Sequence, residues 1–156
     1  MAWREDATFG DASLTGNLAV TGTTTLTGDV TVVGDFIWTV GLTVSAESTN
    51  TVTVAVAVTD AVTGASPGVA VALPFYISSD AAGQVLEAGT DLSLTAGTDG
   101  LVILSGGDSK VYGHLVTETT GEMDFVVTDT GTDTYYLNVI LPSGKIVTSG
   151  AITLAA

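Results

Sequence analysis

Glycine recurs at every sixth position near the N-terminus, at Gly10, Gly16, Gly22, Gly28 and Gly34. Asp, Asn or Thr follows each glycine, and the third and fifth positions of most six-residue units are apolar. These two positions lie on the same face of a strand, because side chains alternate along it. Glycine permits the backbone angles of a tight corner, and Asp or Asn can form hydrogen bonds within it. Each unit is therefore predicted to be a short strand with one apolar face and a corner.

Such units suit a β-helix or a three-sided β-prism, in which about 18 residues complete one coil. The repeat units of one chain would make less than about two coils, which is too few to bury a core. Three chains side by side would supply enough units for about five coils. We therefore expect residues 10–41 to form a short trimeric stem and the chain to be a homotrimer. Ordinary hairpins over residues 10–41 are the alternative. The positions predicted to form the trimer core are Leu14, Leu18, Val20, Leu26, Val30, Val32, Phe36 and Trp38.

From Leu42 the period changes, and short alternating segments follow one another with turn clusters such as "TGASPG" and "PSGK" between them. This pattern predicts an antiparallel β-sandwich over residues 42–156. The single helix candidate, residues 81–89, is interrupted by glycine and is predicted to be a loop. The strands are expected at 42–46, 50–59, 68–78, 91–96, 100–105, 110–118, 123–130, 133–142 and 145–155. The inward-facing residues are expected to include Val52, Val54, Val56, Val71, Leu73, Phe75, Ile103, Phe125, Val127, Tyr135, Leu137, Val139 and Ile152. The expected fold class is thus all-β, a stem followed by a sandwich.

The composition excludes several classes of function. The chain carries 17 Asp and Glu against three Lys and Arg, a formal net charge of −14, so it would repel nucleic-acid phosphates. No stretch approaches the roughly 20 apolar residues of a membrane helix, and no signal-like apolar run opens the chain. With no cysteine, disulfides and thiolate chemistry are absent. We expect a soluble protein without a nucleic-acid or membrane partner.

Two residues invite a catalytic interpretation. Ser66 lies at the centre of "GASPG", which matches the nucleophile-elbow pattern, but that motif needs a following helix and a histidine partner. Pro67 follows the serine, so a Pro-Gly turn between strands explains the same letters. His114 is the one histidine of the chain. Zinc sites usually draw on several His or Cys ligands, so His114 is expected to be a strand or edge histidine.

The segment "DTGTD" places Asp129 and Asp133 around a glycine, where they could hold a calcium ion together with backbone oxygens. The closing glutamate of a calcium loop is absent, and a solvated turn before Tyr135 is the favoured interpretation. Paired carboxylates also leave sugar cleavage open, although no aromatic-lined groove is evident. We expect no catalytic residue, no cofactor and no bound metal, and hence no enzyme.

The N-terminal arm, residues 1–9, contains Trp3, Arg4 and Phe9. Aromatic side chains and arginine are the usual anchors of protein interfaces. These three residues are therefore the candidates for contact with a partner, and an unstructured start of the chain is the alternative.

Two parts of the sequence resemble known proteins. Asp129, Gly131 and Tyr135, ahead of an alternating strand, resemble the tyrosine corner before the penultimate strand of immunoglobulin-like domains. The segment "TGNLAVTGTTTLTGDVTVVGDF" resembles the Gly-Thr repeats of tailed-bacteriophage fibres and spikes. A short repeat stem followed by one such sandwich resembles the trimeric capsid decoration (cement) proteins and head fibres of tailed bacteriophages.

This resemblance implies a virion structural role. It implies a protein that is made in the host cytoplasm, lies on the outer capsid surface and has the major capsid protein as its partner. The alternative is a receptor- or glycan-binding fibre or adhesin module, whose sandwich would bind a glycan on the host surface.

Overall fold

The computed structural model describes residues 38–88, 91–105 and 110–155. Within these ranges the chain forms ten β-strands and no helix, and every strand pair is antiparallel. The fold is therefore all-β, as the sequence predicts. The N-terminal arm and the stem up to residue 37 lie outside the described residues, and their structure stays a prediction.

The first sheet has the strand order β1-β2-β7-β4. Its strands are β1 (Trp38–Val44), β2 (Thr51–Asp60), β7 (Glu122–Thr128) and β4 (Ser93–Ala96). The alternation in β2 explains its placement: its valines are buried, whereas threonine and alanine occupy the opposite face. We call this the threonine sheet.

The second sheet has the order β10-β8-β3-β6-β5, and β9 also pairs with β8. Its strands are β3 (Ala72–Ser78), β5 (Leu101–Ser105), β6 (Tyr112–Val116), β8 (Thr134–Ile140), β9 (Ile146–Thr148) and β10 (Ile152–Thr153). None of these strands contains Asp, Glu, Lys or Arg. We call this the neutral sheet.

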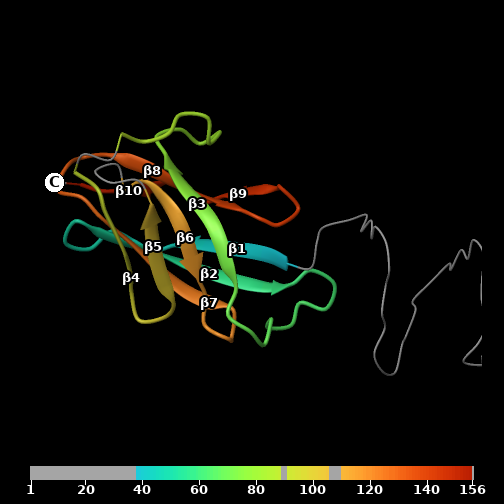
Figure 1. Cartoon of the computed structure of the whole chain (residues 1–156). Coiled ribbons are helices and arrows are strands. Elements are labelled where there is room, and N and C mark those ends of the chain that lie inside the picture. The colour runs from blue at the N-terminus through green and yellow to red at the C-terminus, as the bar shows by residue number, and fades with distance from the viewer. Residues whose placement is uncertain (1–37, 89–90, 106–109, 156) are drawn as a thin grey trace, which may run out of the picture. The chain divides into compact units, whose positions relative to one another are not determined.

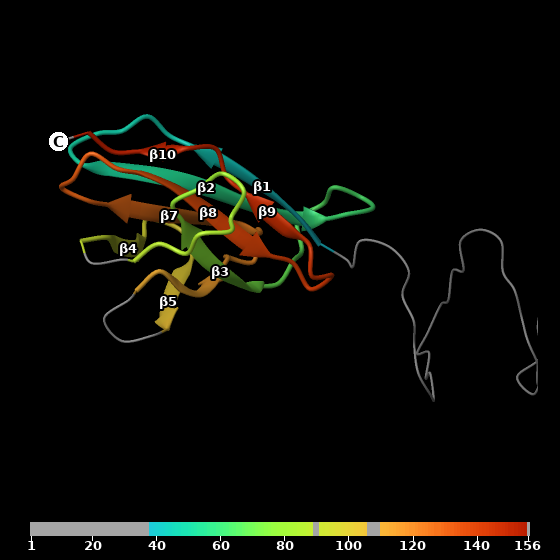
Figure 2. The same ribbon diagram turned by 90° about the horizontal axis from the view of Figure 1, so that it is seen from above.

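The two sheets pack face to face and enclose one hydrophobic core (Figures 1 and 2). Phe75 of β3 and Phe125 of β7 meet at its centre, with ring centroids 4.9 Å apart and an interplanar angle of 75°. This edge-to-face contact links the sheets and is worth about 0.5–1.5 kcal/mol beyond the burial of the rings. The observed architecture is the antiparallel β-sandwich that the alternating segments predict.

The predicted core is confirmed at most positions, and one position is wrong. Twelve of the thirteen residues are buried, whereas Ile103 is 48% exposed. In β5, apolar residues occupy both faces, so the alternation does not reveal which face turns inward. The register with β6 sets Val102 opposite the fully buried Leu115, and both Val102 and Leu104 pack against the core. Ile103 therefore points outward.

The sandwich begins earlier than residue 42. β1 starts at Trp38 and pairs with β2 along its whole length, from Trp38 opposite Asp60 to Val44 opposite Val54. Residues 38–41 therefore belong to the sandwich and not to the stem. The alternation of Trp38, Val40 and Leu42 continues the inward face of β1, which explains why the sequence does not mark the boundary.

The segment predicted to be a loop, residues 81–89, contains turns and no helix as far as residue 88, where its description ends. The loop is closed by Asp80, whose Oδ1 accepts hydrogen bonds from the backbone N–H groups of Gln84 (2.9 Å) and Val85 (2.7 Å). Tyr76 of β3 donates its hydroxyl to the Gly83 carbonyl at 2.9 Å. This loop therefore packs on part of the outer face of the neutral sheet.

Candidate functional site

Most residues that the sequence singles out for partner contact lie outside the described ranges. These are Trp3, Arg4 and Phe9 of the arm and Leu14, Leu18, Val20, Leu26, Val30, Val32 and Phe36 of the stem. Trp38 is the exception. It is partly buried and packs against the sandwich core, which differs from its predicted place in the trimer core.

Ser66 lies in the loop between β2 and β3, as the turn interpretation predicts. Its hydroxyl donates to the carbonyl of Thr119 at 3.2 Å. Gly64 and Gly68 on either side have φ of 69°, which only glycine adopts without strain. The next element is the strand β3 and not the helix that a nucleophile elbow requires.

His114 lies on β6 with its side chain on the exposed outer face of the neutral sheet. Its register partners are Pro74 of β3 and Ile103 of β5. The prediction of a strand histidine is confirmed. Among the described residues, no three or more His, Cys, Asp or Glu side chains form a group that could hold a metal ion.

The turn before β8 is solvated at Thr130, Thr132 and Asp133, as predicted, but Asp129 at its start is only 2% exposed. Its carboxylate accepts a hydrogen bond from the Tyr135 hydroxyl and another from the backbone N–H of Gly131 at 2.9 Å. Burial, followed by the hydrogen bond to Asp129, raises the pKa of Tyr135 well above the usual tyrosine range. Asp133 is exposed. Asp129 therefore holds the corner together as an acceptor.

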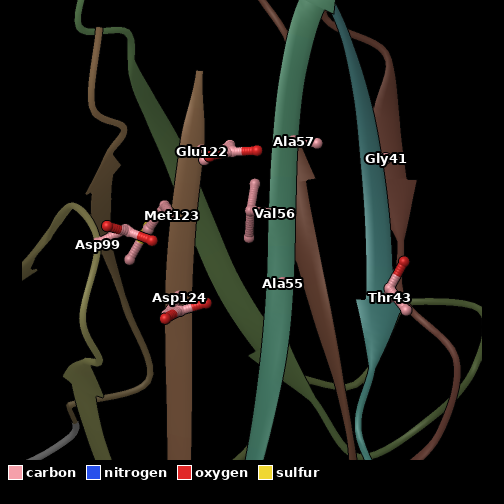
Figure 3. A pocket seen from close by; sticks show the side chains of 9 residues that line it. All are labelled: Gly41, Thr43, Ala55, Val56, Ala57, Asp99, Glu122, Met123 and Asp124. Carbon is pink, nitrogen blue, oxygen red and sulfur yellow. The ribbon is translucent and has the colours of Figure 1, made fainter. Parts of the chain in front are cut away.

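The outer face of the threonine sheet carries a shallow depression of about 320 Å³ (Figure 3). Its floor is made of small residues, Gly41 of β1 with Ala55 and Ala57 of β2. Glu122 and Asp124 of β7 stand opposite Ala57 and Ala55 in the register. The depression is therefore shallow, and two carboxylates stand at its rim on a face that is otherwise rich in threonine. An Asp124 oxygen accepts the backbone N–H of Thr98 at 3.3 Å, so this carboxylate is tied to the β4–β5 turn.

The outer face of the neutral sheet has a different character. Leu101 and Ile103 of β5 are 54% and 48% exposed, and Tyr112 of β6 is 40% exposed. The register aligns these side chains with neighbours on β6 and β3, so they form rows across three strands. We define the apolar face by six exposed outward residues, namely Ala72, Pro74, Leu101, Ile103, Tyr112 and His114.

The sequence analysis did not single out this face. A signal was present, since "LVIL" places four apolar residues in a row, which a strand can bury on one face only. The surplus apolar residues of such a strand must lie outward.

Over β8 and the end of β3, the neutral sheet carries a polar network that is buried. Asn138 of β8 donates from Nδ2 to the Ser78 hydroxyl at 2.8 Å, and its Oδ1 accepts from the Thr148 hydroxyl at 2.8 Å. Asn138 and Ser78 are fully buried. The outer face is therefore covered at Asn138, whereas Ala72 and Pro74 of β3 and the outward residues of β6 and β5 named above are exposed in the described part of the chain.

In the described part of the chain, no helix has the length and apolar character that a membrane crossing requires. No family model matches the chain, and neither a curated protein nor a solved structure matches it significantly.

Proposed function

We propose that this chain is a virion structural protein, a homotrimeric capsid decoration (cement) protein of a tailed bacteriophage. It would bind the major capsid protein and stabilise the outer capsid surface. The observation that carries the proposal is the glycine repeat at six-residue spacing, followed directly by one compact sandwich. A short repeat stem of this kind needs three chains to bury a core, and a sandwich of this size can bury its own.

We also propose that the sandwich is immunoglobulin-like. The order β1-β2-β7-β4 corresponds to the A-B-E-D sheet of such domains. In the second sheet, β3 corresponds to strand C, β8 to strand F, and β9 and β10 at the edge to strand G. The hairpin β5–β6 would be an addition beside β3. The Tyr135 hydroxyl ties back to the Asp129 side chain, whereas the tyrosine corner of immunoglobulin domains ties back to the backbone.

The arm is proposed to make the capsid contact. Trp3, Arg4 and Phe9 precede the stem, so a trimer would present three copies of them together. Three weak contacts act as one strong contact, because each later contact is intramolecular. The sandwiches would then point outward, where their negative charge opposes aggregation.

Deletion of residues 1–9 tests this proposal. The shortened chain should remain a folded trimer and should no longer sediment with capsids that have been stripped of the protein. The full chain serves as the positive control. If the shortened chain rebinds as well as the full chain, the contact lies elsewhere and the proposed orientation is wrong.

The same preparation distinguishes the alternative. A receptor- or glycan-binding module would bind intact host cells, or glycans prepared from them, and would not rebind the stripped capsids. That result would replace the decoration function with the fibre or adhesin function.

A further inference from the structure

We infer that the apolar face of the neutral sheet is a contact surface for a second copy of this chain. The contact is made by the sandwich itself and adds to any association through the stem. The inference rests on the proposed homotrimer for the number of copies. For the location of the contact it rests on the described surface.

The apolar face is continuous across three strands. Pro74, His114 and Ile103 lie in one row across β3, β6 and β5, because His114 pairs with both of the others. The next row contains Ala72 and Leu101, which both pair with Val116. Exposed side chains thus adjoin one another across three strands, and all of them except His114 are apolar. Contiguous exposed apolar surface of this kind marks an interaction site.

The apolar face extends to an edge strand. β5 is the last strand of the neutral sheet in the strand order, and it contains no charged residue and no proline. Proteins usually protect edge strands with charges, proline or a covering element, because an open edge pairs with other chains. The lack of charge and proline in this edge strand is explained if a second copy covers it.

The distribution of charge over the described residues favours a second copy as the occupant. The formal net charge of −14 means that two copies repel each other when their acidic surfaces approach. The described carboxylates lie in turns and on the threonine sheet, and no strand of the neutral sheet carries one. They are Glu47, Asp60, Asp80, Glu87, Asp91, Asp99, Glu118, Glu122, Asp124, Asp129 and Asp133.

The described lysines lie at the margins of the neutral sheet. Lys110 stands two residues before Tyr112, and Lys145 directly precedes Ile146, the first residue of β9. Asp99 and Glu118 stand equally close to the ends of β5 and β6, so the margins carry both signs of charge and only the strands themselves are uncharged. A second acidic copy therefore meets less repulsion at this sheet than at the threonine sheet, and this favours a second copy as the occupant.

The exposed aliphatic side chains also favour a protein occupant over a sugar. Leu101 and Ile103 offer no hydrogen-bonding group, whereas a glycan needs polar partners for its hydroxyl groups. In a trimer held by its stem, the second contact is intramolecular, so a face of modest size is sufficient. In a three-fold ring, this face meets a different surface of its neighbour.

The experiment compares two double variants of the full chain by sedimentation equilibrium. Leu101→Glu with Ile103→Glu places two carboxylates on the apolar face, at exposed positions where the monomer fold tolerates them. Ala61→Glu with Val62→Glu adds the same charge in the exposed β2–β3 loop and is the matched control. We expect the first variant to raise the dissociation constant of the oligomer at least about a hundredfold over the control, because it buries unpaired charge.

A second measurement does not depend on the charged variants. The chain contains no cysteine, so Ile103→Cys and Val62→Cys each provide a single thiol. Maleimide should label Cys at 103 at least about tenfold more slowly in the oligomer than after dissociation, when the face is open. The label at position 62, on a side chain that is 90% exposed, should react at the same rate in both states.

Equal dissociation constants for the charged variant and its control would overturn the inference. So would equal labelling rates at position 103 in the two states. If the charged variant remains an oligomer but loses capsid or glycan binding, the face belongs to that partner and not to a second copy. A full chain that is monomeric yet rebinds capsids overturns this inference and leaves the decoration function standing.

Discussion

The Tyr135 hydroxyl and the Asp129 carboxylate form a side-chain hydrogen bond that closes the turn before β8. The tyrosine hydroxyl donates to a carboxylate that is almost fully buried. Tyr135→Phe removes the donor and leaves the Asp129 carboxylate short of a partner in the interior. We expect the variant to lose about 1–3 kcal/mol of unfolding free energy, because an unsatisfied buried acceptor carries its full desolvation cost. Urea denaturation followed by circular dichroism measures this loss, and Tyr112→Phe, on the exposed outer face, is the control.

The pH dependence of the same pair has a defined sign. The pKa of Tyr135 is raised in the folded chain, so the native state holds this proton more tightly than the unfolded state. The stabilisation is therefore fully present below the unfolded tyrosine pKa of about 10 and is lost as the pH rises above it. Between about pH 9 and 11 the wild-type chain should lose stability more steeply than Tyr135→Phe. Parallel pH profiles would contradict this assignment.

Gly121, in the turn before β7, is required for both conformation and space. Its φ is 87°, and a Cβ added there would lie 2.2 Å from the Val58 carbonyl oxygen. Gly64 has φ of 69° with nothing within 4 Å, so it isolates the conformational part. Gly64→Ala should cost about 1–3 kcal/mol, and Gly121→Ala should cost clearly more because β2 must also shift. Equal losses in urea denaturation would show that the turn accommodates the methyl group.

At the scale of elements, β1 decides where the sandwich begins. It supplies Val40 to the core and covers one edge of β2 from Val54 to Asp60. A fragment of residues 38–156 should therefore fold cooperatively as a monomer or weak oligomer. A fragment of residues 45–156 lacks β1 and should lose at least about 3 kcal/mol, because it forfeits the burial of Val40 and the partial burial of Trp38 and Leu42.

The two fragments are compared by urea denaturation followed by circular dichroism. Trp38 is the single tryptophan of the longer fragment, and its fluorescence reports the packing of β1 directly. Equal stability of the two fragments would show that β1 contributes nothing to the core.

At the scale of the whole molecule, the proposed trimer depends on the fifth positions of the repeat. Val20→Asp with Leu26→Asp would place unpaired charges on the shared axis, where their burial is costly. The full chain should then dissociate at micromolar concentration. Thr21→Asp with Thr27→Asp adds the same charge one position further along, on the opposite strand face, and should leave the trimer intact. Sedimentation that finds a monomer for the unmodified chain would contradict the trimeric stem.

The sequence by itself determined the fold class and most of the core. In β2, valines alternate with threonine and alanine, so one face is distinctly more apolar and its burial follows from the two-residue period. The sequence predicted the turn at Gly64–Gly68 equally well, because its proline and glycines favour particular backbone angles without contacts from distant residues. Local chemistry was sufficient wherever the two faces of a strand, or the residues of a turn, differ clearly.

The tertiary structure decided what depends on partners distant in the sequence. β5 is apolar on both faces, and its pairing with β6 determined that Ile103 points outward and Val102 inward. The sequence predicts Asp129 to be a surface residue of a polar turn. The Tyr135 hydroxyl donates a hydrogen bond to its carboxylate, and this bond offsets part of the cost of burying it. Trp38 continues the apolar pattern of the repeat, but it lies opposite Asp60 of β2 and therefore belongs to the sandwich. In each case the local sequence left the burial of the side chain undecided, and its free energy depended on a strand or a side chain that the fold brings next to it.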